Sequence, residues 1–418
     1  MHPRQRPRTP WRQAWLAAAF AGLAAGASAQ QPAGTTASLP ALFEAAWARQ
    51  PEAQALPLRR DAAQAQRRAA DAWTPEPPAL EASLKTDRLQ RDEGAREMEL
   101  GIAVPLWLPG ERGSAAALAQ AEASALESRA QAARLRLAAT VREAWWQWQR
   151  AGLELDVARG QLDSAQGIAR DVARRAQAGE LARADQHQAD GAVAAAQAAL
   201  ASAEAAATAA QLQLQALAGA GPLAPPAGSP PAEPEPPPAE PATHPALLEL
   251  ADRATTAERS AALASRQSRA NPELLLATTR DRGAYGEREG RTLTLALRVP
   301  FGGGPRHDRR VATARADAAE AQAQLALDRE RLQWEAQAAR AQVAAARQQL
   351  AAAERRATLA RETRGFFDKS FRLGETDLPT RLRIETEAAE AERQAARARI
   401  DLAAAISALR QALGLLPL

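Results

Sequence analysis

The 418-residue sequence contains no cysteine, and it has only two methionines and four histidines. The lack of cysteine excludes disulfides, thiol catalysis, thiolate metal sites and lipidation of an N-terminal cysteine. The histidines are scattered, and neither a His-Glu-x-x-His nor a Gly-x-Ser-x-Gly motif occurs. We therefore expect a protein that is not an enzyme, with no catalytic residues, no bound cofactor and no metal site.

Aromatic residues are also scarce, at 4% of the chain, whereas alanine, arginine, glutamine and glutamate dominate. This composition forms helices readily but fills a wide core poorly, so it favours an elongated, mostly helical protein. Long apolar runs are missing as well, since even the alanine-rich residues 192–210 are interrupted by glutamine and glutamate. If the mature protein spans a membrane, it must use strands.

A surplus of basic residues is confined to the N-terminus. Arg4, Arg6, Arg8 and Arg12 precede the apolar run AWLAAAFAGLAA, and a small-residue motif ends at Ala29. This pattern is typical of a secretory signal peptide over residues 1–29, although an uncleaved anchor helix is an alternative. The rest of the chain has equal numbers of acidic and basic residues, so we expect no nucleic-acid partner.

The remaining sequence repeats one pattern twice. Two Val-Pro pairs, Val104-Pro105 and Val299-Pro300, lie 195 residues apart, and so do the Gly-Glu pairs that begin at Gly179 and Gly374. This constant spacing predicts two copies of one unit, residues 30–218 and 245–418. A proline-rich linker, residues 219–244, joins them.

Each copy is predicted to contain two strands, one long helix and one return helix. In the first copy, these cover about residues 79–87, 97–105, 112–177 and 181–218, and in the second about 273–281, 291–300, 305–372 and 376–413. The strands alternate, with Met98, Leu100 and Ile102 on one face, and have about the length that crosses a bilayer. Two small soluble hairpins are the alternative. Four strands cannot close a membrane barrel, so several chains would have to contribute.

Apolar residues in the first long helix recur by alternate steps of four and three, beginning at Leu137, Val141, Ala144 and Trp148. This period of 3.5 residues predicts supercoiled helices packed through small side chains. The tryptophans in this region are expected to be packing residues. Each long helix, about 100 Å at 1.5 Å per residue, matches the summed length of two shorter ones. We expect the second long helix to lie beside the N-terminal helix.

Three segments carry a resemblance to a known family: residues 104–123 (VPLWLPGERGSAAALAQAEA), 172–197 (VARRAQAGELARADQHQADGAVAAAQ) and 366–394 (FFDKSFRLGETDLPTRLRIETEAAEAERQ). With the signal peptide and the tandem copies, they resemble the TolC-type outer-membrane efflux proteins. The Val-Pro-Leu form is most similar to the cation-efflux (cobalt-zinc-cadmium) branch.

This resemblance implies a mostly α fold with a small β part. Tandem long α-hairpins form a coiled-coil tunnel, and four strands per chain contribute to a twelve-stranded transmembrane β-barrel in a homotrimer. It implies a passive exit duct in the bacterial outer membrane with a long periplasmic extension. The partners are outer-membrane lipid, a periplasmic adaptor protein and an inner-membrane pump of the resistance-nodulation-division type. The cargo, metal cations or drugs, stays open.

The resemblance also assigns roles to residues near the Gly-Glu pairs. Gly179 with Glu180 and Gly374 with Glu375 are implied to form the periplasmic tip where the adaptor docks. Asp185 matches an acidic constriction position of the family. Thr380 occupies the equivalent place in the second copy, and Arg383 lies where the family often has another acid. An Asp185–Arg383 pair between neighbouring helices is one hypothesis, and a merely solvated helix face is the other.

Two other functions remain as alternatives. A periplasmic adaptor would also have a signal peptide and a long helical hairpin, but only one copy. A coiled-coil scaffold would not explain the Val-Pro strand ends. The glycine-rich segment VPFGGGPRHDRR, residues 299–310, could suggest a phosphate loop, but it lacks the Lys-Ser/Thr such a loop needs. We expect a joint between a strand and a helix there.

Overall fold

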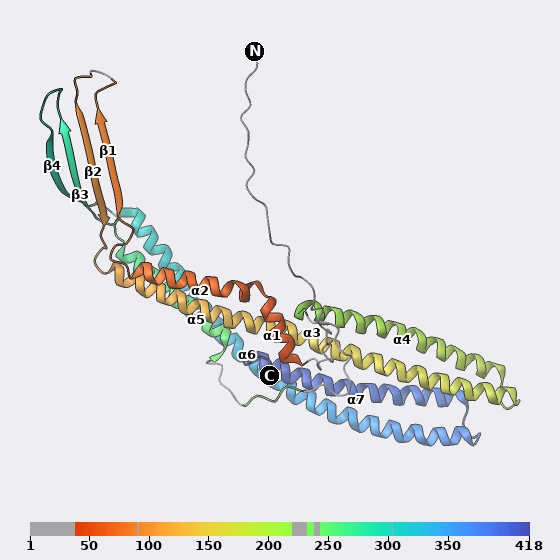
Figure 1. Ribbon diagram of the computed structural model, residues 1–418. Helices are drawn as coiled ribbons and strands as arrows, with labels where there is room; N and C mark the ends of the chain where they lie inside the picture. Colours follow the sequence, from red (N-terminus) through yellow and green to blue (C-terminus); the bar gives the residue numbers. More distant parts are fainter. Residues whose placement is uncertain (1–37, 90–91, 220–231, 238–242, 303) are drawn as a thin grey trace, which may run out of the picture. The chain divides into compact units, whose positions relative to one another are not determined.

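A computed structural model describes residues 38–89, 92–219, 232–237, 243–302 and 304–418 (Figure 1). The predicted signal peptide and most of the proline-rich linker lie outside these residues. The described chain is mostly helical, with one small sheet, so the fold class predicted from the sequence is confirmed.

Four strands form one antiparallel sheet. They are β1 (Ala79–Thr86), β2 (Arg96–Pro105), β3 (Glu273–Arg282) and β4 (Gly290–Arg298), in the spatial order β1-β2-β3-β4. Each copy supplies one hairpin, and β2 and β3 join the two hairpins into one sheet. β1 and β4 are its edges. Because side chains alternate along a strand, the register divides the sheet into two chemically different faces.

The first face carries the large apolar side chains, and we call it the apolar face. Its members are Leu80, Leu84, Met98, Leu100, Ile102, Leu274, Leu276, Leu293, Leu295 and Leu297, all of them exposed. The opposite, polar face holds every acidic residue of the four strands: Glu81, Glu97, Glu99, Glu273 and Asp281. The opposite face carries one large apolar residue, Leu275, which is half-buried, so the large exposed apolar side chains of the sheet all lie on the apolar face.

Two long helices follow the hairpins. α3 (Glu111–Gln177) follows β2 and turns back into α4 (Arg183–Ala218), and α6 (Gly304–Arg372) follows β4 and turns back into α7 (Leu378–Ala412). Three shorter helices precede the strands: α1 (Leu39–Arg49), α2 (Pro51–Ala70) and α5 (Pro245–Arg266). α3 lies beside α4 and α5, and α6 lies beside α7 and α5 (Figure 1).

One packing expectation is wrong for the single chain. The N-terminal helix α2 lies against α3, and the short helix beside the first half of α6 is α5. The reason is that the two hairpins pair through β2 and β3, which brings α5, the helix that enters β3, between the two long helices. In the described part of one chain, α6 therefore lacks the neighbour that α2 provides for α3.

The main core surrounds the middle of α3. Trp145, Trp146 and Trp148 are buried there with Phe43 of α1 and Leu214 of α4. The seam of 3.5-residue period is buried or half-buried at each position from Leu137 to Ala176. The interpretation of the tryptophans as packing residues is therefore confirmed.

The glycine-rich segment after β4 is a strand-to-helix joint. Gly302 has φ of 91° and Gly304 has φ of 43°, in the left-handed region where a side chain would be strained. The sheet that it leaves is antiparallel throughout, so the parallel βαβ unit of a phosphate-binding loop does not surround it.

Candidate functional site

The first Gly-Glu pair ends α3 in a Schellman turn. Gly179 has φ of 81°, and its N–H donates to the carbonyl of Ala176 at 3.1 Å. The Glu180 N–H donates to the carbonyl of Arg175 at 2.9 Å. These two bonds satisfy carbonyls that the helix end would leave unpaired, and only glycine takes the left-handed conformation without strain. The sequence needs glycine here to reverse the chain.

The second Gly-Glu pair ends α6 in the same way. Gly374 has φ of 78°, its N–H donates to the carbonyl of Phe371 at 3.1 Å, and the Glu375 N–H donates to that of Ser370 at 3.0 Å. Both turns leave open space around the glycine. The turn glutamates therefore stand beside exposed backbone in both copies.

Phe371 joins the two turns. Its ring is 2% exposed and packs with Ile168 and Val172 of α3 and with Leu378 of α7. The α3–α4 and α6–α7 hairpins consequently share one small apolar cluster at their ends. We call this group the tip cluster.

Two arginines cover the Phe371 ring from opposite copies. The Arg175 guanidinium carbon lies 4.9 Å from the ring centroid, and that of Arg381 lies 4.6 Å from it. Arg175 also donates to Glu180 at 3.1 Å, and Arg381 donates to Asp368 at 2.9 Å. Cation–π contacts of this kind contribute about 0.5–2 kcal/mol each. The arginines thus connect the turn glutamate of the first copy to the aromatic ring of the second.

A carboxylate stands at the start of each return helix, but at different positions. In α4, the Asp185 carboxylate accepts the Ala182 N–H at 3.1 Å. In α7, the Asp377 carboxylate accepts the Thr380 N–H at 3.2 Å. Hydrogen bonds from Thr380 hold the pKa of the Asp377 carboxyl below its usual range. The acid that Thr380 replaces is therefore present three residues earlier, where it caps the helix.

Arg383 points along its own helix. Its guanidinium donates to Glu387 at 2.7 Å, and both side chains are exposed. In the described part of one chain, Asp185 and Arg383 are not paired with each other. The pair across neighbouring helices therefore stays a prediction.

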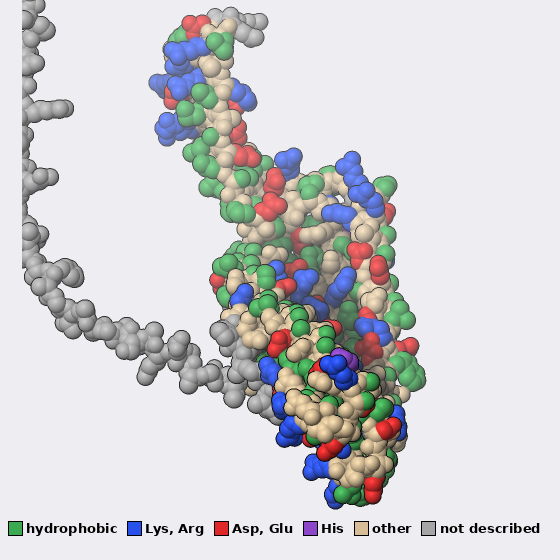
Figure 2. Space-filling view, turned by 90° about the vertical axis from the view of Figure 1, so that its right-hand side faces the viewer, with side chains coloured by type: hydrophobic (Ala, Val, Ile, Leu, Met, Phe, Trp, Pro, Cys, Tyr) green, Lys and Arg blue, Asp and Glu red, His purple; other side chains and the backbone are tan. Residues whose placement is uncertain are grey.

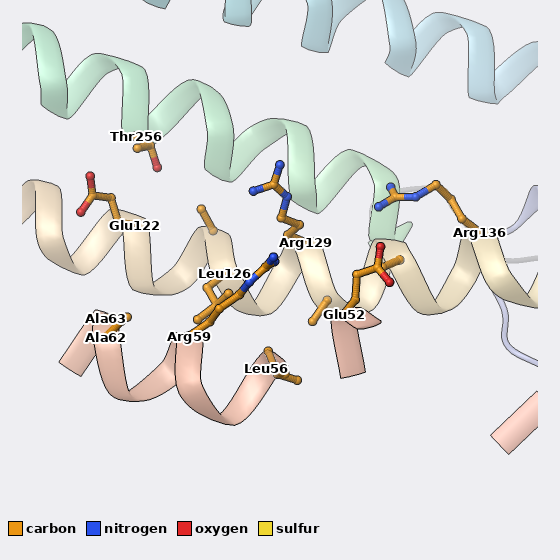
Figure 3. A pocket seen from close by; sticks show the side chains of 13 residues that line it. Glu52, Leu56, Arg59, Ala62, Ala63, Glu122, Leu126, Arg129, Arg136 and Thr256 are labelled. Atoms are coloured by element: carbon orange, nitrogen blue, oxygen red, sulfur yellow. The ribbon is translucent and has the colours of Figure 1, made fainter. Parts of the chain in front are cut away.

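A groove lies between α2, α3 and α5 (Figure 3). It measures about 630 Å³, and Arg59, Glu122, Arg129 and Thr256 are among its lining residues. Alanine, arginine and glutamate make up most of its lining, and no histidine or cysteine is among the lining residues. Nowhere in the described residues do three or more His, Asp or Glu side chains gather as a metal site would require.

The sequence missed the tip cluster because its contacts depend on which hairpins meet. Phe371 and Arg381 belong to the second copy, but Arg175 belongs to the first. Arg175 precedes its turn glycine by four residues and Phe371 precedes its own by three, but this spacing does not reveal that the two side chains touch.

None of the described helices combines the length and the apolar character of a membrane span.

The chain is similar to known proteins both in a family model and in solved structures. Residues 42–220 match the family model described as outer membrane efflux protein. A membrane protein from Pseudomonas aeruginosa has 21% identity and a TM-score of 0.73, with 90% of this chain and 93% of that chain covered. VceC, an outer membrane protein of Vibrio cholerae, has 18% identity and a TM-score of 0.72, with coverages of 90% and 96%.

A third solved structure, CusC, has 16% identity and a TM-score of 0.73, with 93% of this chain and 96% of that chain covered. A comparison with curated protein sequences finds no match. The predicted resemblance to the TolC-type outer-membrane efflux proteins is confirmed.

Proposed function

We propose that this chain is the outer-membrane exit duct of a tripartite efflux system. The observation that carries the proposal is the sheet, whose apolar face carries ten exposed large apolar side chains while its polar face holds all the strand acids. An exposed apolar surface of this extent is unfavourable in water and is stable against lipid. The polar face would then line the water-filled passage.

The open edges of the sheet support a ring of chains. β1 and β4 each have one side without a partner in the described chain, and backbone groups left unpaired in lipid cost several kcal/mol. Pairing β4 of one chain with β1 of the neighbouring chain satisfies both edges. Three chains would give the twelve strands that the family resemblance implies.

The exposed side of α6 supports the same assembly. Leu327, Trp334, Leu359 and Phe366 of this helix are all more than 60% exposed. A neighbouring chain would place its own helices against this side, as α2 covers α3 within the chain. The homotrimer is therefore a proposal about the helical wall as well as the barrel.

The tip is proposed to bind the periplasmic adaptor. Gly179, Glu180, Gly374 and Glu375 form the two turns that follow the last residues of α3 and α6, the long helices whose first residues follow the strands. The adaptor would in turn connect the duct to an inner-membrane pump that supplies the energy. The cargo is metal cations or drugs, and the pump selects it.

The tunnel constriction is proposed at Asp185, Thr380 and Arg383. The Asp185 carboxylate already accepts one backbone bond, and Arg383 already has Glu387. A bond between Asp185 and Arg383 of neighbouring chains would therefore compete with local partners. Reversing the charge of Arg383 should raise the resting conductance if this bond holds the tip closed, and an unchanged conductance would remove the hypothesis.

Cell fractionation followed by single-channel recording tests the duct itself. We expect a heat-modifiable trimer in the outer-membrane fraction that conducts ions across a planar lipid bilayer. A soluble periplasmic product without conductance would instead support the adaptor or the coiled-coil scaffold.

A further inference from the structure

Four arginines gather at the hairpin end of the apolar face. The register pairs Arg96 of β2 with Arg282 of β3, and Arg280 of β3 with Arg291 of β4. Directly paired residues share a face of the sheet, and so do residues two apart on one strand. All four side chains therefore belong to the face that carries the exposed leucines. We call them the arginine cluster, and Figure 2 shows basic side chains gathered on one side of this end of the molecule.

This arrangement is unfavourable without an anion. Like charges directly opposite each other in a sheet repel, and each of the two cross-strand pairs is arginine against arginine. Among the described residues, Arg96, Arg280 and Arg291 take part in no ion pair. Arg282 donates to the carbonyl of Gly94, at 3.2 Å, and its guanidinium carbon lies 5.6 Å from the centroid of the Tyr285 ring, but it pairs with no acid of the described chain.

Two acids share a small hollow with the cluster but form no ion pair with it. Asp281 and Glu289 line a small hollow together with Arg96, Arg280 and Arg282, but neither forms an ion pair with them in the described chain. Asp281 lies on the polar face, since it is paired with Glu97. The apolar face itself has no acidic residue in any of its four strands.

The height of the cluster relative to the apolar band is informative. From Val104 to Met98 the band spans six residues, or about 20 Å at 3.4 Å per residue. Arg280 and Arg291 stand at the level of Met98, and the other two arginines stand one level beyond it. The positive charges therefore begin where the apolar band ends, and in the proposed duct this is the level of the lipid headgroups.

We propose that the arginine cluster binds the phosphate groups of an anionic lipid in the outer leaflet of the membrane. This inference rests on the proposed function, which places the hairpin ends on the outside and the helices in the periplasm. Guanidinium groups bind phosphate in a bidentate manner, and four of them on two neighbouring levels fit a lipid with more than one phosphate. The leucines below the cluster would contact the acyl chains of the same molecule.

A membrane lipid fits the cluster better than a free anion. A soluble phosphate would contact arginines that are exposed or half-buried and that no cavity encloses. Water and salt would therefore weaken its binding. A lipid instead gains from the apolar face and from the cluster together. The phosphates of a bound lipid would therefore offset the repulsion between the paired arginines, although the site is not an enclosed pocket.

The test uses the purified full-length protein in phosphatidylcholine nanodiscs that contain a small fraction of lipid A, a diphosphorylated glycolipid. Lipid A retained by the protein is counted by native mass spectrometry. We expect the double variant Arg280→Gln/Arg291→Gln to bind lipid A about 100-fold more weakly, from a factor of about ten for each charged contact. Arg280→Lys/Arg291→Lys should retain part of the affinity.

Arg298→Gln is the matched control. Like Arg291→Gln, it removes one positive charge from β4. Arg298, however, lies on the polar face at the other end of the strand, 3.5 Å from Glu273. We expect wild-type affinity from this control. Equal affinity of the double glutamine variant and the wild type would overturn the inference, and so would an equal loss in Arg298→Gln.

Two further arms separate the possible failures. Millimolar inorganic phosphate should not displace lipid A, and full displacement would show a free-anion site and overturn the lipid assignment. Wild-type conductance is recorded alongside. If the wild type conducts and the glutamine variants still bind lipid A, only this inference fails, whereas a wild type that neither inserts nor conducts ends the proposed function. If the glutamine pair does not fold, the lysine pair decides by the same comparison.

Discussion

The long helices α3 and α6 occupy the same place in the two copies and have almost the same length, 67 and 69 residues. Yet α3 buries 19 residues and α6 only seven. Part of this difference is missing neighbours, because α1, α2, α4, α5 and α7 all contact α3, whereas α6 contacts only α5 and α7 extensively within the described chain.

The other part is sequence divergence. Trp145 and Trp148 of α3 correspond to Arg340 and Val343 of α6, and the buried Arg142 corresponds to the exposed Gln337. The first copy therefore holds the wide core of one chain. The second copy keeps a narrow, alanine-rich seam and an exposed side. Of the two long helices, α3 therefore stabilises the chain, whereas the exposed side of α6 is available to another chain.

The largest expected effect comes from Glu233, in the described part of the linker. Its carboxylate is buried between Arg142 of α3, at 2.8 Å, and Arg410 of α7, at 3.2 Å. Glu233→Ala would leave two buried guanidinium groups without their counter-ion, at a cost of about 3–5 kcal/mol. We expect a correspondingly earlier midpoint in urea unfolding followed by circular dichroism.

Glu235→Ala is the control for that change. Glu235 is two residues farther along the linker and pairs with Arg347, but both side chains are about half exposed. Exposed pairs contribute at most about 1 kcal/mol. Equal effects of the two substitutions would contradict the account of Glu233 as the buried connection between α3 and α7.

Trp145→Ala tests the wide core directly. The side chain is 2% exposed, so its removal should cost about 3–5 kcal/mol. At the matching position of the second copy, Arg340→Ala should cost no more than about 1 kcal/mol, because that side chain is exposed. Thermal unfolding of the two variants would measure the contrast, and similar losses would show that α6 carries as much of the core as α3.

Phe371→Leu tests the tip cluster, where the copies meet. Leucine keeps most of the buried apolar area but removes the aromatic face between Arg175 and Arg381, so a loss of about 1–3 kcal/mol is expected at the tip. Looser hairpin ends should raise resting conductance in planar bilayers. Phe366→Leu, at a 67% exposed position of the same helix, is the control for the loss of stability at the tip and should leave that stability unchanged.

A structural feature could be predicted from the sequence where the residues that form it lie close together along the chain. The alternating strands, the 3.5-residue seam and the glycines of the two turns depend on neighbours a few residues away, so the fold class was predictable. Glu233 and Phe371 were not, because each is buried by helices from both copies. The proline-rich composition around Glu233 predicted only a linker, yet two distant arginines bind its carboxylate.

Trp334→Ala has a small expected effect on the single chain and a larger one on its assembly. The side chain is 66% exposed on α6, so unfolding of an isolated chain should change by no more than about 0.5 kcal/mol. If a neighbouring chain covers this side of α6, the substitution should weaken the trimer, which would then dissociate in detergent at a higher protein concentration than the wild-type trimer does. Sedimentation in detergent measures the oligomer, and an unaltered trimer would mean that other residues form the contact.

The smallest expected effect is local and depends on pH. The pKa of Asp377 is lowered by its bonds to Thr380, so the ionised carboxylate stabilises the start of α7. That stability is present above the unfolded pKa of aspartate, near pH 4, and is lost as the pH falls through the lower folded value. Hydrogen exchange, corrected for its intrinsic pH dependence, should show reduced protection at Thr380 in acid. Asp377→Asn still caps the helix but cannot titrate. Protection at Thr380 in this variant should therefore stay constant over the same range, and a pH dependence equal to that of the wild type would assign the effect to another group.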